Sequence, residues 1–345
     1  MQKCDTLPLP ALKSTNDDMT TTMTDFRDIM IKELDILRRI SVTEDAGIFK
    51  ARSYAAAIKA IQALPPIYTA ADIPAPQKGD GLGKEIRIKM EKIITTGSLN
   101  ISAETRGTVD SLEAFQNIYG VGPKKAMDLI KGGYRTIADL RAALAKDAKF
   151  LNKNQTVGLK YYEELLERIP RAEMDEHAAM LMACKPAALE GVIVGSYRRG
   201  QPNSGDIDML LTCKQGADAG KWLQDFIAAL KAKGYMKEIL AQGDTKCLAI
   251  SQLPGCKARR LDLLITPPDE FGCAVVYFTG SDGFNVRMRQ HALDRGFTLN
   301  EHALTQVSTG KKVGGIKTER DVFTVLKLQW KEPTERTGPE AVLIK

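Results

Sequence analysis

Asp206 and Asp208 are the residues of this chain whose type and spacing most clearly suit chemistry. They stand two apart at the start of an apolar run, Ile207 to Leu211, that predicts a strand. Because side chains alternate along a strand, both carboxylates point to one face while Ile207 and Met209 face the other. Two like charges this close repel each other unless a cation neutralises them, and a hard divalent ion such as Mg²⁺ prefers oxygen ligands.

A third carboxylate, Asp262, lies on another short apolar run, Leu261 to Leu263. Three carboxylates on adjacent strands match a two-metal site for in-line phosphoryl transfer. Taken alone, an Asp-x-Asp triplet is also common on an ordinary solvated strand face. The stretch just ahead of it, Gly195 to Gly200, favours the metal site over that alternative.

That stretch, GSYRRG, follows a β-branched run at 192–194. A strand that ends in Gly195-Ser196 and a polar turn presents backbone N–H groups to an anion. Arg198 and Arg199 add positive charge there. We therefore expect a phosphate cradle beside the carboxylates.

The composition is that of a protein with more than one core. A chain of 345 residues suits about two or three domains, and 43% hydrophobic with 27% charged residues is typical of a soluble protein. No apolar run approaches the length of a membrane span. A net charge of +6 fits a polyanionic partner. Basic and acidic side chains nearly balance in residues 1–102, so any such binding there depends on individually placed contacts.

The cysteines, the histidines and the amino terminus argue against a disulfide-rich protein, a zinc site and a mitochondrial presequence. The six cysteines show no CxxC or paired spacing, which indicates free thiols in a reducing compartment, and three scattered histidines do not suit a zinc site. Residues 1–24 are polar and predict a disordered tail. A mitochondrial presequence is disfavoured because Asp5, Asp17 and Asp18 interrupt it and no arginine precedes Arg27.

A repeated hairpin pattern follows the tail. Two helices are predicted between Phe26 and Ala63, and the turn Gly81-Leu82-Gly83 precedes a third helix that ends at Gly97. The pattern recurs where Gly120-Val121-Gly122 leads into Pro123 at a helix start. A helix, a glycine hairpin and a helix N-terminus can grip a phosphate through backbone N–H groups, although the repeat can also serve packing alone.

These stretches together resemble one known family. GSYRRG, SGDIDMLLT, RRLDLLI and the block VVYFTGSDGFNVRMRQHALDRGFTLNEHAL are similar to motifs of the family X DNA polymerases, in particular DNA polymerase beta, with some features of polymerase lambda. The resemblance extends from about residue 25 to Pro333. It implies an α+β multidomain fold: a lyase-like helix-hairpin-helix domain at 25–102, a DNA-binding helix-hairpin-helix subdomain at 103–167, a mixed-sheet catalytic palm at 168–267 and a nascent-base-pair subdomain at 268–345.

The resemblance assigns roles in the palm. Asp206 and Asp208 bind both Mg²⁺ ions, with Mn²⁺ as an alternative. Asp262 completes the ion that activates the primer 3′-hydroxyl and accepts its proton, while Arg260 steadies the primer end. The β and γ phosphates of the nucleotide are expected on Ser196, Arg199 and the backbone of Gly205.

In the subdomain that follows, the sugar is expected to pack against Tyr277, Phe278 and Gly280, and the Tyr277 backbone excludes a 2′-hydroxyl. Asp282 and Asn285 lie against the base, and Arg289 reaches the template nucleotide. A donor to the minor groove checks the geometry of a base pair, since acceptors occur there in every correct pair.

The resemblance also implies a lyase. Lys89 matches the lysine that forms a Schiff base with a 5′-deoxyribose phosphate, although by position alone it is a solvated helix lysine. Glu85 and Arg52 depart from the family pattern, and Lys84, Lys50 and Arg52 are candidates for the phosphate contact. DNA is expected at the hairpins, at Gly81, Gly83, Lys84, Gly120 and Gly122, with a monovalent cation on the backbone of Gln116, Ile118 and Val121.

One further departure concerns the control of opening and closing, and the length of one segment concerns template dependence. Leu264 stands where DNA polymerase beta has an arginine that engages the catalytic aspartate. The segment that joins the palm strands, residues 241–262, is short, which favours dependence on a template strand.

The resulting hypothesis is a template-dependent DNA polymerase that fills short gaps in base excision repair and also removes the 5′-sugar phosphate. Its expected partners are gapped or nicked DNA, deoxynucleoside triphosphates and repair proteins, and it is expected to be a nuclear monomer without membrane contact; mitochondrial, viral or cytoplasmic sites stay open. The alternatives are a lambda-like end-joining polymerase, disfavoured because no BRCT-like extension precedes residue 25, and a DNA-end-binding module without lyase activity or catalysis. A small-molecule or RNA nucleotidyltransferase shares the palm but not the paired hairpins.

Overall fold

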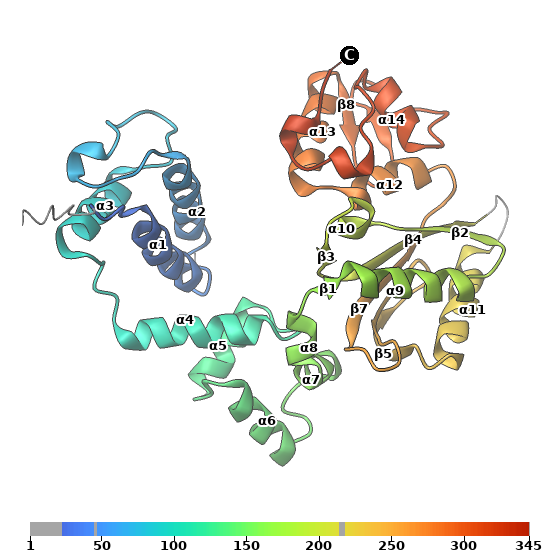
Figure 1. The fold of residues 1–345 in the computed structure, drawn as a ribbon, viewed down its shortest axis with the longest axis horizontal. Coiled ribbons are helices and arrows are strands. Elements are labelled where there is room, and N and C mark those ends of the chain that lie inside the picture. Colours follow the sequence, from blue (N-terminus) through green and yellow to red (C-terminus); the bar gives the residue numbers. More distant parts are fainter. Residues whose placement is uncertain (1–22, 45–46, 214–217, 345) are drawn as a thin grey trace, which may run out of the picture. The chain divides into compact units, whose positions relative to one another are not determined.

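The computed structural model describes residues 23–44, 47–213 and 218–344. The chain divides into two compact units, one that runs to Glu113 and includes Pro123–Arg135, and one made of Ala114–Gly122 and Thr136 onward. Each unit is considered by itself (Figure 1). The expected disordered tail, residues 1–24, falls almost entirely outside the described residues.

The first unit is helical. Its helices are α1 (Arg27–Ser41), α2 (Ile48–Ala63), the 3₁₀ turn η1 (Ala70–Asp72), α3 (Lys84–Thr96), most of α4 (Ala103–Gln116) and α5 (Pro123–Lys131). The helices expected before residue 97 are confirmed. α3 ends at Gly97, whose φ of 78° is a left-handed conformation that glycine adopts without strain.

Helices α1, α2 and α3 share one apolar core. Met30 and Leu34 of α1 are one turn apart and fully buried, and they pack with Ile86, Met90 and Ile93 on one face of α3. The spacing i, i+4, i+7 gives α3 a single buried stripe. Its remaining faces are left for polar residues.

The second unit contains a mixed sheet. Helices α6 (Ile137–Lys146), α7 (Lys153–Lys160) and α8 (Tyr162–Leu166) precede it. Its strands lie in the order β2 (Leu189–Ile193), β4 (Ile207–Cys213), β7 (Arg259–Ile265), β6 (Lys246–Ser251), β5 (Met236–Gln242). β4 and β7 are parallel, and every other neighbouring pair is antiparallel. The α+β fold class with a mixed-sheet palm is thereby confirmed.

The two faces of this sheet are covered differently. Helices α9 (Arg171–Cys184) and α11 (Ala219–Ala232) share one core with Ile207, Met209, Leu261 and Leu263. On the other face, Leu210 packs with Ala274 and Val275 of α12 (Phe271–Thr279). A two-stranded ladder pairs β1 (Ile169–Pro170) with β3 (Asn203–Ser204), so the entry to the palm is tied to the loop ahead of Asp206.

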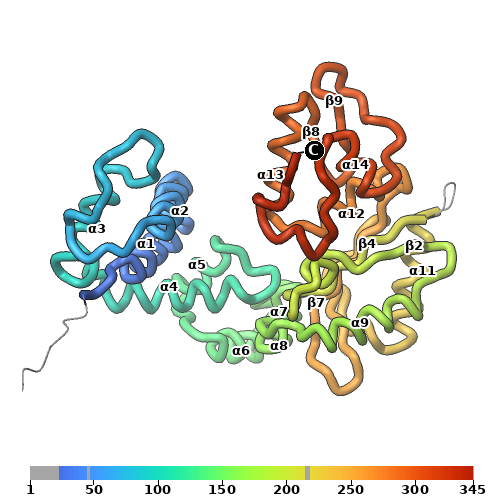
Figure 2. The backbone as a smooth tube through the Cα atoms, turned by 45° about the horizontal axis from the view of Figure 1, so that its top comes forward, coloured from blue at the N-terminus to red at the C-terminus, as the bar shows by residue number. Residues whose placement is uncertain are grey.

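The carboxyl-terminal part of this unit has its own core around Phe284, Met288, Leu304 and Phe323. Figure 2 follows the chain from the sheet through α12 into this part. Its elements are α13 (Asp282–Asp294), the hairpin of β8 (Phe297–Leu299) and β9 (Leu304–Gln306), α14 (Glu319–Val325) and the 3₁₀ turns η2 (Pro333–Glu335) and η3 (Pro339–Ala341).

Two sequence expectations on the chain as a whole can be compared with the structure. Cys184, Cys247, Cys256 and Cys273 are free thiols, as expected. In the described ranges, no helix combines the length and apolarity needed to cross a membrane.

Candidate active site

Asp208 and Asp262 lie side by side on the sheet. Their Cα positions are partners in the parallel pairing of β4 with β7, and Asp206 directly precedes β4. Two residues further along each strand, Leu210 and Leu264 join the apolar cluster against α12. The carboxylates therefore share the face that α12 covers further along, and the prediction that they lie on adjacent strands is confirmed. Leu264 serves packing there and offers no charge to the aspartates.

The charges of this group are only partly neutralised. Burial, followed by the charges of Asp206 and Asp262, raises the pKa of Asp208 to about 7. Burial also raises the pKa of Asp262, against the opposing effect of Arg260. Arg260 donates from Nη2 to Asp206 Oδ2 at 2.5 Å, and its Nε is buried with no hydrogen-bond partner among the described residues. Arg260 and Lys246 thus act as positive charges on the carboxylate group.

The donor set suits divalent cations. All three side chains offer carboxylate oxygens, which Mg²⁺ and Mn²⁺ prefer, and a cation would favour the charged forms of Asp208 and Asp262. In the described part of the chain, however, no three His, Cys, Asp or Glu side chains converge closely enough to hold an ion as they stand. In the structure, Asp206 is paired with Arg260.

The turn after β2 touches the same carboxylates. Gly195 has a φ of +63° and begins the short helical turn α10 (Gly195–Arg198). The positive φ favours glycine, and a Cβ atom on residue 195 would also lie close to Asp208 Oδ2, at 3.0 Å. The Ser196 hydroxyl donates to Ser204 at 3.0 Å. Gly205, on the loop ahead of Asp206, is exposed.

The two arginines of this turn both bond Thr279, the last residue of α12. Arg199 donates to the Thr279 carbonyl at 2.7 Å. Arg198 donates to the Thr279 hydroxyl at 2.7 Å and to both carboxylate oxygens of Glu319 at 2.9 and 2.6 Å. Glu319 is therefore paired with Arg198, which is expected to add positive charge to the phosphate turn.

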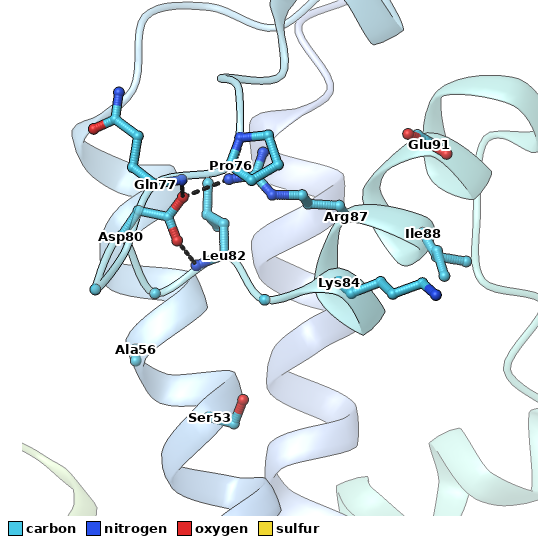
Figure 3. Close-up of a pocket in the computed structure, with 13 residues that line it drawn as sticks. Ser53, Ala56, Pro76, Gln77, Asp80, Leu82, Lys84, Arg87, Ile88 and Glu91 are labelled. Atoms are coloured by element: carbon cyan, nitrogen blue, oxygen red, sulfur yellow. Dashed lines mark hydrogen bonds and ion pairs between the residues drawn. The ribbon is translucent and has the colours of Figure 1, made fainter.

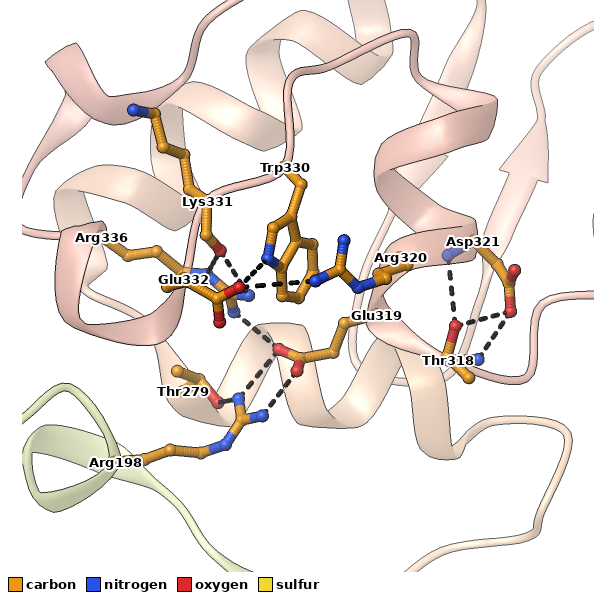
Figure 4. A network of polar contacts seen from close by, with 10 residues as sticks. All are labelled: Arg198, Thr279, Thr318, Glu319, Arg320, Asp321, Trp330, Lys331, Glu332 and Arg336. Carbon is orange, nitrogen blue, oxygen red and sulfur yellow. Dashed lines mark hydrogen bonds and ion pairs between the residues drawn. The ribbon is translucent and has the colours of Figure 1, made fainter.

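Figure 4 shows how Glu319 is shared. Arg336, which is fully buried, donates to Glu319 Oε1 at 2.6 Å from the side away from Arg198. Arg336 also donates to the Lys331 carbonyl and stacks near the rings of Phe323 and Trp330. This network joins the turn at Arg198 to α12 and α14.

A groove of about 400 Å³ opens between α12 and α13. The structure gathers most of the residues expected to contact the nucleotide and the template in this groove, which is lined by Tyr277, Phe278, Asp282, Asn285, Val286 and Arg289. Asn285 donates to the Tyr277 carbonyl at 2.7 Å, so this amide already holds the backbone expected to contact the sugar. Gly280 lies just outside, with a φ of +68°, where a Cβ would approach Arg199 to 3.2 Å.

Sequence reasoning missed two residues of this region. Val286 lines the groove with 59% of its surface exposed, and its place one helical turn after Asp282 was the available signal. Glu319 carried no signal, because its partner Arg198 is 121 residues away.

Lys89 belongs to the other unit. It lies on α3 in a groove of about 500 Å³ whose further lining includes Lys50, Ser53, Tyr54, Lys84 and Glu85. Its Nζ is 3.5 Å from the Glu85 carbonyl and 3.9 Å from the Glu85 carboxylate, and 26% of the side chain is exposed. Arg52 does not line this groove, whereas Tyr54, which sequence reasoning missed, does.

The first hairpin forms a second groove of about 590 Å³ (Figure 3). Gly81 has a φ of +75°, and a Cβ there would lie 3.1 Å from the Ala56 carbonyl. Asp80 accepts from the backbone N–H groups of Leu82 and Gln77, which lowers its pKa, and it also pairs with Arg87. Nothing lies within 4 Å of a Cβ at Gly83, so α3 begins in open space, and the next residue, Lys84, is exposed.

The second hairpin is a tight turn between Gln116, the last residue of α4, and Gly122. Gly120 has a φ of +82°, and its carbonyl accepts from the Gln155 side chain at 3.0 Å. The Ile118 carbonyl accepts from the Val121 N–H at 3.0 Å. The carbonyls expected to hold a monovalent cation thus occur within one turn.

Three family models match the chain. The fingers domain of DNA polymerase lambda matches residues 113–166, the DNA polymerase beta palm matches residues 168–268, and the DNA polymerase beta thumb matches residues 274–337. All the carboxylates and the turn at Gly195 lie in the palm match. The groove between α12 and α13 lies in the thumb match.

Relatives of named function are similar over most of the chain. DNA polymerase lambda of Rattus norvegicus is 34% identical over 84% of this chain, and DNA polymerase lambda of Arabidopsis thaliana is 32% identical over 74%. The type-X family protein pol4 of Schizosaccharomyces pombe is 26% identical over 83%. The chain spans 52% of the length of the first two relatives and 60% of the third.

Proposed function

This chain belongs to the family X DNA polymerases, and on that premise we propose that it is a template-dependent DNA polymerase that fills short gaps in base excision repair. We propose in addition that its amino-terminal domain removes a 5′-deoxyribose phosphate. The observation that carries the polymerase proposal is the register of β4 and β7. It sets Asp208 beside Asp262, next to a turn whose Gly195 has a positive φ and lies close to the Asp208 carboxylate.

In this proposal Asp206, Asp208 and Asp262 hold two Mg²⁺ ions, with Mn²⁺ as an alternative. When bound, such ions would supply charge neutralisation for an in-line displacement. Asp262 accepts the proton of the primer 3′-hydroxyl. Arg260 exchanges its bond to Asp206 for the primer end, and its unpartnered Nε supports such an exchange.

The nucleotide is proposed to lie between the turn at Gly195 and the groove of α12 and α13. Ser196, Arg199 and the Gly205 backbone hold its β and γ phosphates. Its sugar packs on Tyr277, Phe278 and Gly280, and its base lies against Asp282 and Asn285. Arg289 reaches the template nucleotide.

For the lyase, Lys89 attacks the sugar aldehyde as a neutral amine, and loss of water gives an imine. Loss of a C2′ proton then breaks the C3′–O bond and frees the 5′-phosphate of the downstream strand. Lys50 and Lys84 line the same groove as Lys89, which supports them as phosphate contacts in place of the basic residue that Glu85 replaces.

We propose gapped or nicked DNA and deoxynucleoside triphosphates as substrates, repair proteins as further partners, and the nucleus as the site of action of a monomer. The hairpin glycines Gly81, Gly83, Gly120 and Gly122 grip DNA phosphates, and the carbonyls of Gln116, Ile118 and Val121 hold a monovalent cation. These assignments extend the family match to the parts that bind the ends of the gap.

A second candidate is end joining, because two of the named relatives are lambda polymerases and the fingers match is lambda-like. The two candidates differ in substrate. A gap-filling enzyme prefers a gap with a continuous template strand, whereas an end-joining enzyme extends a primer across two separate ends.

Primer extension on a duplex with a one-nucleotide gap tests the proposal. Wild type is expected to add one templated nucleotide with Mg²⁺ and none with EDTA, and Asp208→Asn is expected to add none. Asp225→Asn is the control, because Asp225 is an exposed carboxylate of α11 paired with Lys221. Extension without a divalent ion would contradict the proposal. Binding to the gap without incorporation would instead support a DNA-end-binding module.

A further inference from the structure

The chain continues beyond the thumb match, which ends at residue 337. We call residues Gly338–Ile344 the C-terminal strap. Its η3 turn contacts α13, and in Figure 2 the red end of the chain runs beside that helix. Ala341 is 8% exposed within the thumb core. The strap is thus packed against the thumb core.

Both ends of the strap are fixed. At its far end, the Gln329 backbone donates to the Leu343 carbonyl at 2.9 Å, and the Gln329 side chain donates to the Ile344 carbonyl at 3.0 Å. At its near end, the chain leaves Arg336, whose guanidinium is held by Glu319 (Figure 4). The strap therefore joins the Glu319 network to Gln329.

The strap supports the first turn of α13. A Cβ atom on Gly283 would lie 3.0 Å from Pro339 Cδ, so the Pro339 ring fits here because residue 283 has no side chain. The Ser281 N–H, at the start of the same helix, donates to the Arg336 carbonyl at 3.3 Å. Glycine weakens a helix, because it leaves the unfolded chain more freedom than other residues do. Close packing against Pro339 gives a physical reason for it at this position.

Gly283 stands between residues of the groove. Asp282 precedes it directly, and Asn285 follows two residues later, and both line the groove proposed for the base and sugar. Consecutive Cα atoms are only about 3.8 Å apart, so a shift of Gly283 moves its neighbours. Gly283 itself does not line the groove. The strap therefore acts on the groove through the helix backbone.

We propose that the C-terminal strap is a positioning element for nucleotide binding, in which Pro339 against Gly283 sets the first turn of α13 and hence Asp282 and Asn285. This inference rests on the proposed polymerase function. Neither Gly283 nor Pro339 touches the substrate. Their substitution should change nucleotide binding more than the chemical step.

The test compares single and double variants of the full chain on a one-nucleotide gap. Gly283→Leu keeps a good helix former but drives a side chain into the Pro339 ring. It is expected to raise KM for the correct nucleotide about tenfold while kcat stays within about twofold. In the double variant with Pro339→Gly, which removes the ring, KM is expected to fall most of the way back.

Gln290→Leu is the matched control, because Gln290 is exposed on α13 and does not line the groove. Its KM is expected to be that of wild type. Hydrogen exchange at residues 282–285 should quicken in Gly283→Leu and slow again in the double variant, while exchange in α9 stays that of wild type; a general loss of stability would quicken both.

If Gly283→Leu does not fold, the single variant Pro339→Gly tests the strap proposal. It is expected to raise KM a few-fold and to quicken exchange at residues 282–285. An unchanged KM in folded Gly283→Leu, or no recovery in the double variant, overturns the strap proposal while wild-type incorporation upholds the polymerase. Absence of incorporation by wild type overturns the proposed function, and the strap proposal with it.

Discussion

The palm and the amino-terminal unit each carry a candidate chemical group, but they hold it in different ways. In the palm, strand pairing fixes Asp208 beside Asp262, and burial raises the pKa of both carboxyls. In the amino-terminal unit, Lys89 stands on one helix and contacts Glu85 from the same helix. The first group depends on the whole sheet, and the second depends on one local turn.

This difference shows where each group is vulnerable. The palm carboxylates are costly to keep together and need a cation, so removal of one should abolish the chemistry they support. Lys89 needs no assembled partner beyond its groove. The two groups should therefore respond independently to substitution.

Asp262→Asn should give the largest effect. Loss of one carboxylate removes both a metal ligand and the proposed proton acceptor, so kcat for gap filling should fall on the order of 10³-fold. Trapping of the protein by borohydride on a gap that bears a 5′-deoxyribose phosphate should be unchanged. If Asp262→Asn still fills the gap, or if it is no longer trapped, the two chemical groups do not act independently as proposed.

Lys89→Ala is the converse change. Without the amine no imine forms, so the trapped yield should fall by at least about 10²-fold while gap filling stays at the wild-type level. Lys92→Ala is the control, since Lys92 lies on the same helix and donates to the Leu99 carbonyl. If wild type fills the gap but is not trapped, Glu85 and the departure at Arg52 have disabled the lyase and this domain only grips the DNA end.

Arg259→Ala tests how firmly the palm is held. Arg259 is 4% exposed, bonds both carboxylate oxygens of Glu173 and donates to the Glu167 carbonyl. Its loss leaves Glu173 with an uncompensated charge and should lower the free energy of unfolding by about 3 kcal/mol. In the other unit, Arg106 forms an ion pair with Glu33. Arg106→Ala should lower the free energy of unfolding by only about 1 kcal/mol, because Arg106 is 39% exposed to screening solvent and Glu33 keeps its bond from the Leu99 N–H.

Hydrogen exchange of α9 and α1 in urea measures the two units separately. If Arg259→Ala and Arg106→Ala lower the free energy of unfolding equally, the buried ion pair of the palm stabilises its unit no more than the partly exposed pair stabilises the amino-terminal helices.

A further expected effect is a dependence of stability on pH. His177 is fully buried and bonds the Tyr235 hydroxyl at 2.7 Å, and burial lowers its pKa to about 4 from 6.5. The unfolded chain binds this proton more readily, so stability is fully present above pH 6.5 and falls by up to about 3 kcal/mol as the pH drops towards 4. Glu173, whose pKa is lowered, and Arg259 face the same ring.

His177→Gln should flatten this slope between pH 6.5 and 5, because it removes the titrating group. The three histidines of the chain all lie in the second unit, so the amino-terminal unit should show no such slope. An identical slope in wild type and His177→Gln would assign the effect to carboxylates instead.

Local patterns predicted much of the structure. The alternation around Asp208 predicted which residues face the core, and the glycine at 97 predicted the end of α3, because both depend on neighbours in the sequence. The family resemblance added the roles of Lys89 and Arg260, which alternation and spacing could not supply. Those roles stay predictions.

The rest depends on partners that are distant in the sequence. Arg260 pairs with Asp206 across 54 residues, and Arg198 pairs with Glu319 across 121. The packing of Pro339 on Gly283 depends on a turn beyond the thumb match. No local period or propensity encodes such pairs, so sequence reasoning missed Glu319 as the partner of Arg198.

The parallel pairing of β4 with β7 also has a consequence for how the protein is made. Helix α11 and strands β5 and β6 lie between these two strands in the sequence, so a long loop must close before they meet, and such closures are slow. Helices α1–α3 need only local contacts, and domains emerge from synthesis amino terminus first. A nascent chain that ends before Arg259 would already carry Lys89 on a formed helix and would still lack Asp262.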